Sequence, residues 1–263
     1  MPFIEIDEQL CARDGICVAE CPLDLLELSS DKIPVAVAGA ETACLRCGHC
    51  IVSCPNGALR LDGQDPAGLP AVPRQPIEPD AAIGFLASRR STRNWKDKNV
   101  SRELIERAID AARYAPSGLN MQPVHWLVVE TAEEMRRLAG LTADFLRQSG
   151  TMARFVEAFD AGKEVILRGA PRLVVAHADA EGWYDPTTDC ILALAHFELA
   201  AHALGLGTCW AGLFMRAARH WPPLAQALDL PAGHKVYGGL MLGYPKFKSH
   251  RLPPRRAARI RYQ

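Results

Sequence analysis

CLRCGHCIVSCP, residues 44–55, is the stretch that decides how the N-terminal part of this chain folds. Its four cysteines have the spacing C-x2-C-x2-C-x3-C, and Pro55 follows the last of them. Soft thiolates on one tight loop can hold three corners of a cubic iron–sulfur cluster, and the cysteine beside the proline ligates the other cluster of a two-cluster protein. The motif therefore predicts a second copy in the chain.

A second copy lies 33 residues upstream. Its members are Cys11, Cys17, Cys21 and Pro22. The segments that follow the two copies also correspond, because CPLDLLEL begins at Cys21 and CPNGALRL begins at Cys54. A repeat that includes apolar packing positions favours an internally duplicated domain over chance cysteines.

Two other uses of these cysteines fit less well. Zinc sites commonly bring cysteines in separated pairs, whereas four fall within eleven residues here. A disulfide framework belongs to exported proteins, and the opening residues MPFIE show no charged-then-apolar signal peptide. The spacing therefore predicts iron–sulfur clusters in a reducing cytoplasm.

Asp14 is the departure from the repeat, because it stands where a cysteine is required. Its carboxylate can ligate a fourth iron as a harder ligand than thiolate, or the site holds a cluster of three irons, or a cube that loses its fourth iron easily. Alternatively, Asp14-Gly15 is only a turn dipeptide. The type of the first cluster stays open.

Residues 1–65 resemble bacterial two-cluster ferredoxins. The resemblance implies that a 4Fe–4S or 3Fe–4S cluster is held by Cys11, Cys17 and Cys54 with Asp14. It implies that a second, 4Fe–4S cluster is held by Cys44, Cys47, Cys50 and Cys21.

Composition limits the other possibilities. The chain has 263 residues, 49% of them apolar, and a formal net charge of zero, which gives no reason to expect nucleic acid as a partner. No apolar run approaches the ~18 residues of a membrane span, so no membrane association is expected.

Residues 1–65 hold eleven acids and four bases, so the remainder carries the compensating positive charge. A proline-rich segment, residues 66–80, is predicted to link residues 1–65 to a second domain, residues 81–263.

The second domain is predicted to mix helices and strands, so that the fold class is α+β. Helices are expected at 81–90, from Ser101 to about 115, and at 185–204. Strands are expected at 124–130, 173–177 and 236–242, and a buried strand or turn at 208–214. No G-x-G-x-x-G follows a strand, which disfavours a Rossmann dinucleotide site. The histidines form no metal pattern and are predicted to be structural.

Three segments of this domain carry chemistry. RRSTR, residues 89–93, offers guanidiniums and hydroxyls that suit a phosphate. APSGLNMQP, residues 115–123, offers backbone N–H groups and amides to a planar polar ring. GLGTCWAG, residues 205–212, has glycines that let the backbone approach a ligand closely.

Taken in this order, and with GYP at residues 243–245, these segments resemble the nitroreductase family of FMN flavoproteins. The resemblance implies a nitroreductase-like α/β sandwich, an intertwined homodimer, and an FMN at its interface. It implies phosphate and ribityl contacts from Arg89, Arg90, Ser91 and Arg93, completed by Lys248 and Arg251. It also implies flavin contacts from Ser117, Gly118 and Asn120, from the other subunit, and from Trp210, Ala211 and Gly212. The backbone of Gly212 is expected near the flavin N5, with no side chain as obligatory acid or base.

The fusion of the two modules suggests the function. Clusters move single electrons, whereas reduced FMN can pass two, so the chain is predicted to be an oxidoreductase that relays electrons from clusters to FMN and reduces a nitroaromatic or quinone-like acceptor. An external ferredoxin, a flavodoxin or NAD(P)H is the expected donor. Three alternatives remain. The chain is a flavin reductase that takes hydride from NAD(P)H and uses the clusters as an electron exit, or an enzyme of specialised chemistry on a flavin-sized or halogenated substrate, or a non-enzymatic electron carrier.

Overall fold

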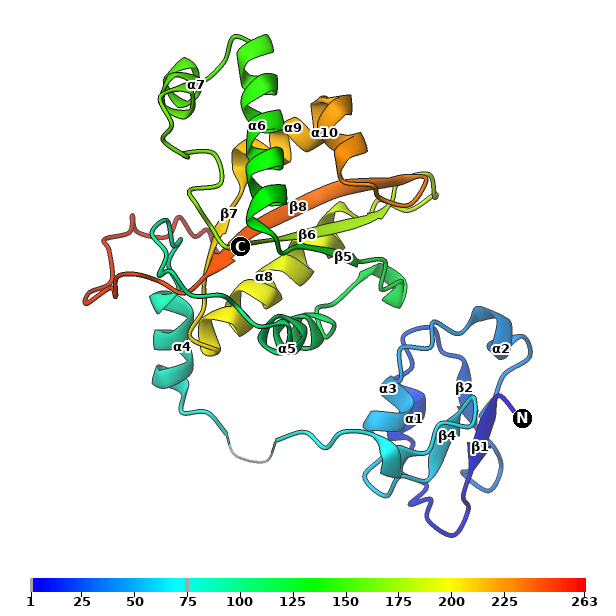
Figure 1. The fold of residues 1–263 in the computed structure, drawn as a ribbon. Coiled ribbons are helices and arrows are strands. Elements are labelled where there is room, and N and C mark those ends of the chain that lie inside the picture. Colours follow the sequence, from blue (N-terminus) through cyan, green and yellow to red (C-terminus); the bar gives the residue numbers. More distant parts are fainter. Residues whose placement is uncertain (1, 74–75) are drawn as a thin grey trace. The chain divides into compact units, whose positions relative to one another are not determined.

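The structure is a computed structural model that describes residues 2–73 and 76–263 (Figure 1). It divides into two compact units. The first comprises Met1–Pro76 with Gly118–Met121, and the second comprises Ile77–Ser117 with Gln122–Gln263. Arg74 and Gln75, within the predicted linker, lie outside the described residues.

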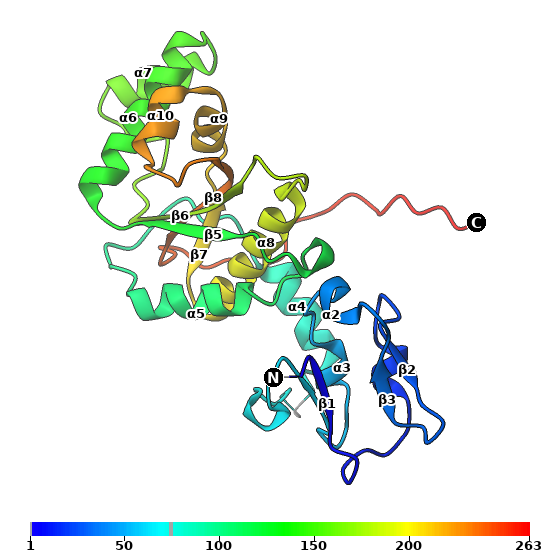
Figure 2. The same cartoon turned by 90° about the vertical axis from the view of Figure 1, so that its right-hand side faces the viewer.

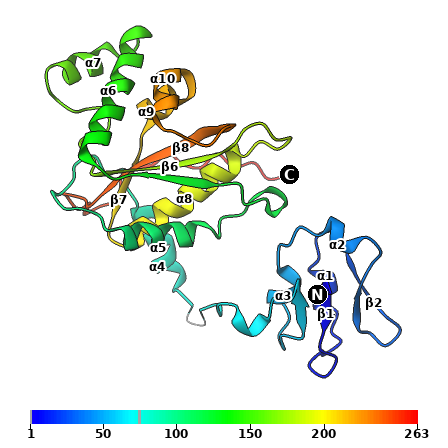
Figure 3. The ribbon, with the colours of Figure 1, turned by 45° about the vertical axis from the view of Figure 1, so that its right-hand side comes forward.

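The first unit is built from two short antiparallel ribbons and three single-turn helices. Its elements are β1 (Ile4–Ile6), α1 (Ile16–Ala19), β2 (Leu26–Leu28), β3 (Pro34–Ala36), α2 (Ala40–Ala43), α3 (His49–Val52), β4 (Leu59–Leu61) and the 3-10 turn η1 (Pro66–Gly68). β1 pairs with β4 and β2 pairs with β3. Figures 1 and 3 show α1 and α3 side by side. Cys17, Leu26, Ile51, Leu59 and Leu61 form the core beneath them.

The internal repeat extends to backbone conformation. Left-handed residues recur at the same 33-residue spacing: Arg13 and Arg46, Gly15 and Gly48, Asp24 and Gly57. Gly15 and Gly48 are the N-caps of α1 and α3, with φ of 72° and 76°. Because this conformation is costly for residues with a Cβ, its recurrence at Arg13 and Arg46 marks a loop shape that both halves require.

The second unit is a four-stranded antiparallel sheet with helices on both faces. The strands are β5 (His125–Val129), β6 (Arg172–Asp179), β7 (Gly207–Trp210) and β8 (His234–Gly243), in the spatial order β5-β6-β8-β7. The helices are α4 (Pro79–Ser88), α5 (Arg102–Ala112), α6 (Ala132–Gln148), α7 (Ala153–Asp160), α8 (Thr187–Ala203), α9 (Gly212–His220) and α10 (Pro222–Ala227), and η2 (Gly118–Asn120) is a 3-10 turn grouped with the first unit.

Each face of this sheet packs against a hydrophobic core of its own, because successive side chains along a strand point to opposite faces. Val174 and Ala176 of β6 pack with α5 and α8, whereas Leu173 and Val175 pack with α6, α9 and α10. Figures 1 and 2 show these two helix groups on opposite faces. Successive strand side chains point to opposite faces, so a sheet covered on both sides needs the continuous apolar run LVVA that β6 supplies.

The structure differs from the sequence expectations mainly around residue 212. The segment 208–214 is a strand only to Trp210, and Gly212 begins helix α9. α4 starts at Pro79, two residues earlier than expected, because proline is well suited to the first helical turn. Ser101 is the N-cap residue of α5, but its hydroxyl makes no capping hydrogen bond to the backbone.

Candidate functional site

The predicted ligands of the first cluster lie together. Cys11, Asp14, Cys17 and Cys54 line one small cavity in the first unit, with Ile6 and Leu59 among its apolar walls. Asp14 Oδ1 accepts the backbone N–H of Ile16 at 3.1 Å, at the start of α1. The loop thus holds the Asp14 carboxylate on the same cavity as three thiols, which is the placement that a cluster ligand needs.

The predicted ligands of the second cluster lie close to the Cys50 thiol. Burial, together with the negative charges of Cys44, Cys47, Cys17 and Cys21, raises the pKa of Cys50 to about 11. Soft metal ions reverse this preference by binding the thiolate. In residues 2–73 and 76–263, no three His, Cys, Asp or Glu side chains are arranged around a single metal ion. A cubic cluster does not require that arrangement, because each thiolate binds a different iron.

Backbone N–H groups also point at the cysteine sulfurs. Leu25 N–H donates to Cys21 Sγ at 3.3 Å, and Ala58 N–H donates to Cys54 Sγ at 3.3 Å. These two bonds occupy equivalent places in the repeat, beside each cysteine–proline pair. Such bonds to sulfur favour thiolate over thiol and tune the potential of a cluster.

The second unit contains a cavity of about 540 Å³ that we call the arginine cavity. Its predicted phosphate ligands are Arg89, Arg90, Ser91, Arg93 and Lys248. Other lining residues include Gly205 in the turn before β7, Gly207 at the start of β7, and Tyr244 and Phe247 in the segment after β8. The structure therefore brings the RRSTR segment, the glycine-rich turn and the GYP segment to one place.

Backbone pairing along the edge strand β7 builds this cavity. Ser91 forms a parallel bridge with Thr208, and the N–H of Thr92 donates to the Thr208 carbonyl at 2.8 Å. Gly207 permits the close approach, because a Cβ at that position would lie 2.8 Å from Thr92 Cβ and 2.9 Å from Pro245 Cγ. The N–H of Lys246 donates to the Asn94 carbonyl at 3.0 Å and ties in the segment after β8.

Glu198 of α8 is a buried anchor that the sequence interpretation missed. It is 7% exposed, and its Oε1 accepts from Arg89 Nη1 at 3.2 Å and from Thr208 Oγ1 at 2.8 Å. A buried carboxylate needs such partners, so the pair fixes Arg89 at the wall of the cavity. The sequence signal that could have revealed Glu198 is a carboxylate within a long helix made mostly of Ala and Leu.

His202, also on α8, lines the same cavity. Its Nε2 lies 2.8 Å from Ser88 Oγ, and its ring stacks on Phe85 with centroids 5.1 Å apart. Burial lowers the pKa of His202, and the positive charge of Arg89 lowers it further. The ring is therefore neutral at pH 7 and adds no charge to the cavity.

Other predicted flavin contacts lie outside both large cavities of the second unit. Trp210, Ala211 and Gly212 form the junction from β7 to α9, and the exposed Arg251 lies beyond the cavity lining. Ser117 Oγ accepts the backbone N–H of Gln122 at 3.0 Å. Gly118 and Asn120 are grouped with the first unit, in which Asn120 Nδ2 donates to the carbonyls of Leu45 and Arg46 at 3.1 Å each.

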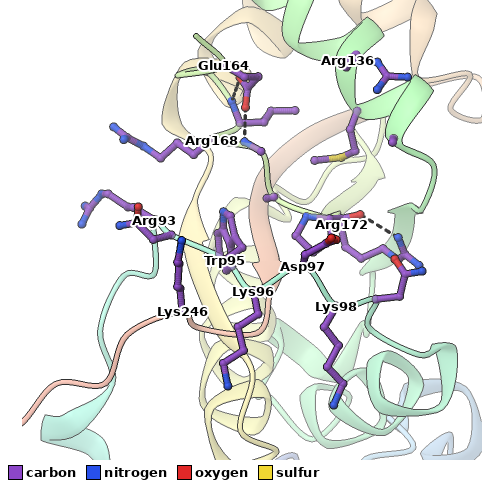
Figure 4. Close-up of a pocket in the computed structure, with 18 of the residues that line it drawn as sticks. Arg93, Trp95, Lys96, Asp97, Lys98, Arg136, Glu164, Arg168, Arg172 and Lys246 are labelled. Atoms are coloured by element: carbon purple, nitrogen blue, oxygen red, sulfur yellow. Dashed lines mark hydrogen bonds between the residues drawn. The ribbon is translucent and has the colours of Figure 1, made fainter.

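A second cavity, of about 810 Å³, shares Arg93, Asn94 and Lys96 with the arginine cavity. We call it the Trp95 cavity, after the indole at its centre (Figure 4). Arg168 lies in its wall, in the loop before β6, and Glu164 holds that loop by accepting the N–H groups of Ile166 at 2.8 Å and Leu167 at 2.7 Å. The sequence interpretation did not single out Arg168 or Glu164, since neither belongs to a motif.

Comparison with known proteins agrees with both units. The model of the nitroreductase family matches residues 86–244, more than half of the chain. A model described as a 4Fe-4S dicluster domain matches residues 10–59. No helix among the described residues is long and apolar enough to cross a membrane.

Individual relatives match a part of the chain. A protein of Archaeoglobus fulgidus, provisionally named an NADH dehydrogenase/NAD(P)H nitroreductase, is 32% identical over 171 residues, which is 64% of this chain and 87% of that protein. The FMN reductase (NAD(P)H) of Bacillus subtilis is 28% identical over 184 residues, covering 65% of this chain and 68% of that protein.

Solved structures share the fold. A nitroreductase with bound FMN from Desulfitobacterium hafniense gives a TM-score of 0.57 at 24% identity, covering 68% of this chain and 96% of that one. A provisionally named nitroreductase in complex with FMN from Desulfovibrio desulfuricans gives 0.50 at 27% identity, covering 68% and 94%.

Proposed function

Because this chain belongs to the nitroreductase family and carries a domain of the 4Fe-4S dicluster type, we propose that it relays electrons from two iron–sulfur clusters to FMN and reduces a small organic acceptor. The observation that carries the proposal is the arginine cavity, whose lining includes every predicted phosphate ligand except Arg251. The nitroaromatic or quinone-like acceptor is the one that the family suggests.

The residues present fit FMN. Arg89, Arg90, Arg93 and Lys248 supply positive charge for a phosphate dianion, and Ser91 supplies a hydroxyl donor. Glu198 keeps Arg89 in place before any ligand arrives, which lowers the entropy cost of binding. The Gly205–Thr208 turn lets backbone approach the ligand.

The FMN and the clusters supply the electron-transfer chemistry when they are bound, the clusters one electron at a time and FMN one or two. Reduction of a nitro group to a nitroso group takes two electrons and two protons and releases water. The chain's own residues bind and orient the cofactors. The cavity histidine, His202, is neutral and already hydrogen-bonded to Ser88, so we assign proton delivery to solvent.

A homodimer completes the proposed flavin site. Ser117 and Gly118 do not line either large cavity of the second unit in their own chain. We assign them, with Asn120, to the flavin of a second copy because the family resemblance implies contacts from the other subunit. Trp210, Ala211 and Gly212 are assigned to the flavin of their own chain.

An anaerobic reductive titration tests the route of the electrons. Flavin and cluster absorbance are followed separately while NADH, NADPH or reduced ferredoxin is added. We expect reduced ferredoxin to bleach the clusters and the flavin. Bleaching of the flavin by a nicotinamide before the clusters would instead favour the NAD(P)H-dependent flavin reductase, which the names of the relatives support. A preparation that never binds flavin would favour the electron carrier.

Two variants test the cofactor sites. Arg93→Ala is expected to lower the FMN content of the purified protein, whereas Arg107→Ala, on the exposed face of α5, is expected to leave it unchanged. Cys47→Ala is expected to lower iron content without displacing flavin. Normal FMN content in the Arg93 variant would remove that residue from the site.

A further inference from the structure

The Trp95 cavity carries more positive charge than FMN requires. Seven basic residues line it: Arg93, Lys96, Lys98, Arg136, Arg168, Arg172 and Lys246. Three acids line it: Asp97, Glu130 and Glu164. Within the described part of the chain, none of the seven bases forms a salt bridge with a carboxylate.

Two of the three acids are already engaged. Glu164 accepts backbone N–H groups of its own loop. Glu130 accepts a bidentate pair from Arg102, which is not part of the lining, with the shortest bond at 2.7 Å. These two acids therefore form their hydrogen bonds with groups other than the seven bases, and the lining keeps an excess of positive charge. An anion that enters the cavity is attracted by this excess.

Three of the bases gather on one side of the indole. Figure 4 shows Arg93, Arg168 and Lys246 on the same side of Trp95, each from a different segment. Arg93 and Arg168 both lower the pKa of Cys209 on β7, against the larger effect of its burial, so the two guanidiniums lie near the same strand. Arg168 is half-buried, which strengthens its interaction with a ligand.

The same cavity is lined by two residues whose buried side-chain N–H groups have no hydrogen-bond partner. Within residues 2–73 and 76–263, Trp95 Nε1 and Arg172 Nε are two of only four buried side-chain polar atoms without a hydrogen-bond partner. Both residues line the Trp95 cavity. Unsatisfied buried donors are uncommon in folded proteins, and they often belong to a ligand site.

We propose that Arg168 and Lys246 bind an anionic group, a carboxylate or a phosphate ester, of the acceptor that the flavin reduces. This inference rests on the proposed function and names the class of its substrate. The single phosphate of FMN is accounted for by the arginine cavity, whose lining does not include Arg168 or Lys246. The volume of about 810 Å³ accommodates an aromatic acid beside the flavin.

The test compares two isosteric acceptors, 4-nitrobenzoate and the uncharged 4-nitrobenzamide. Their dissociation constants are measured by calorimetry on the FMN-loaded full-length protein, and their rates of reduced-flavin reoxidation by anaerobic stopped flow. We expect wild type to bind the benzoate at least tenfold more tightly. The double variant Arg168→Gln/Lys246→Gln should bind it roughly tenfold more weakly than wild type, with binding of the benzamide unchanged.

The control is Arg107→Gln/Lys235→Gln, which removes the same net charge from exposed positions outside the cavity. It should keep the preference for the benzoate. Equal losses for both acceptors, or no preference in wild type, would overturn the inference while leaving the proposed function intact. Loss of FMN from the double variant would also overturn it, because the two bases would then belong to the cofactor site. If the benzoate binds but neither compound is reduced, the two bases form an anion site that does not serve the acceptor, and the inference is overturned.

The same anion chemistry occurs in the extra phosphate that distinguishes NADPH from NADH. Titrating both dinucleotides into wild type and the double variant separates this source from the acceptor. A preference for NADPH that the double variant loses, with no preference between the two nitro compounds, would assign the bases to the donor and overturn the inference.

Discussion

Three histidines meet at the end of the central sheet away from the cavities. His125 begins β5, His177 lies near the end of β6, and His234 begins β8. The Nδ1 atoms of His177 and His234 are 2.9 Å apart, and the His125 ring lies 4.8 Å from that of His234. Burial, together with the charges of the neighbouring His234 and His125, lowers the pKa of His177 to about 4.

This cluster makes stability depend on pH. The unfolded chain protonates His177 near its ordinary value of 6.5, whereas the folded chain does so near 4. Between those values the unfolded state binds more protons, so stability is full above pH 6.5 and falls as pH drops towards 4. We expect a loss on the order of 3 kcal/mol by pH 4, measured by urea unfolding at several pH values. His177→Gln should flatten the profile, and His220→Gln, at an exposed histidine, should keep it. An unchanged slope in the first variant would contradict the assignment.

Asp14 offers a second test at the level of one residue. The flanking left-handed residues Arg13 and Gly15 match Arg46 and Gly48 around Cys47, so the local backbone already suits a cysteine. Asp14→Cys should slow iron loss in air, because thiolate matches iron of a cluster better than carboxylate does. Iron content is measured over time after exposure. Asp31→Cys, at an exposed acid of the same unit, is the control. Faster iron loss in the Asp14 variant would show that the carboxylate is the better ligand.

At the scale of elements, the edge strand β7 connects the RRSTR segment to the sheet. Gly207→Ala would place a methyl group 2.8 Å from Thr92 Cβ and 2.9 Å from Pro245 Cγ. Both neighbours belong to the arginine cavity, so we expect a loss of about 1–3 kcal/mol in stability together with weaker FMN retention. Thermal unfolding and flavin content measure the two effects. Gly84→Ala in α4 has open space for its methyl group and should be neutral or slightly stabilising. A Gly207 variant with wild-type values would show that the pairing along β7 is not required.

The sequence predicted elements best where a single period or motif dominates. The apolar run of β6 and the Ala/Leu-rich α8 were expected close to their observed bounds. The junction at Gly212 was not, because one apolar stretch continues from a strand into a helix without a break in composition. Glu198 and Arg168 escaped notice for another reason. Their roles depend on contacts with Arg89 and on the Trp95 cavity, which only the folded chain brings together.

At the scale of the whole molecule, the unfolding of each unit can be followed by its own spectroscopic signal, cluster absorbance for the first unit and tryptophan fluorescence for the second. The predicted cluster ligands all lie in Met1–Pro76, and the five tryptophans all lie in the second unit. Hydrophobic cores form separately in the two units. A unit with its own core can unfold by itself, so a single transition is not expected for this chain.

Removal of a cluster ligand should therefore act on one unit. The first unit has a small core, so we expect its stability to depend on the proposed clusters, as that of small metal domains depends on their metals. We expect Cys47→Ala to lower the urea midpoint of the cluster absorbance, or to abolish that signal. The midpoint of tryptophan fluorescence should stay within error of the wild-type value. Cys190→Ala, at a fully buried thiol between α8 and the sheet, is the reciprocal control and should lower only the fluorescence midpoint. If Cys47→Ala shifted both midpoints together, the two units would be thermodynamically coupled, and loss of a cluster would weaken the flavin domain as well.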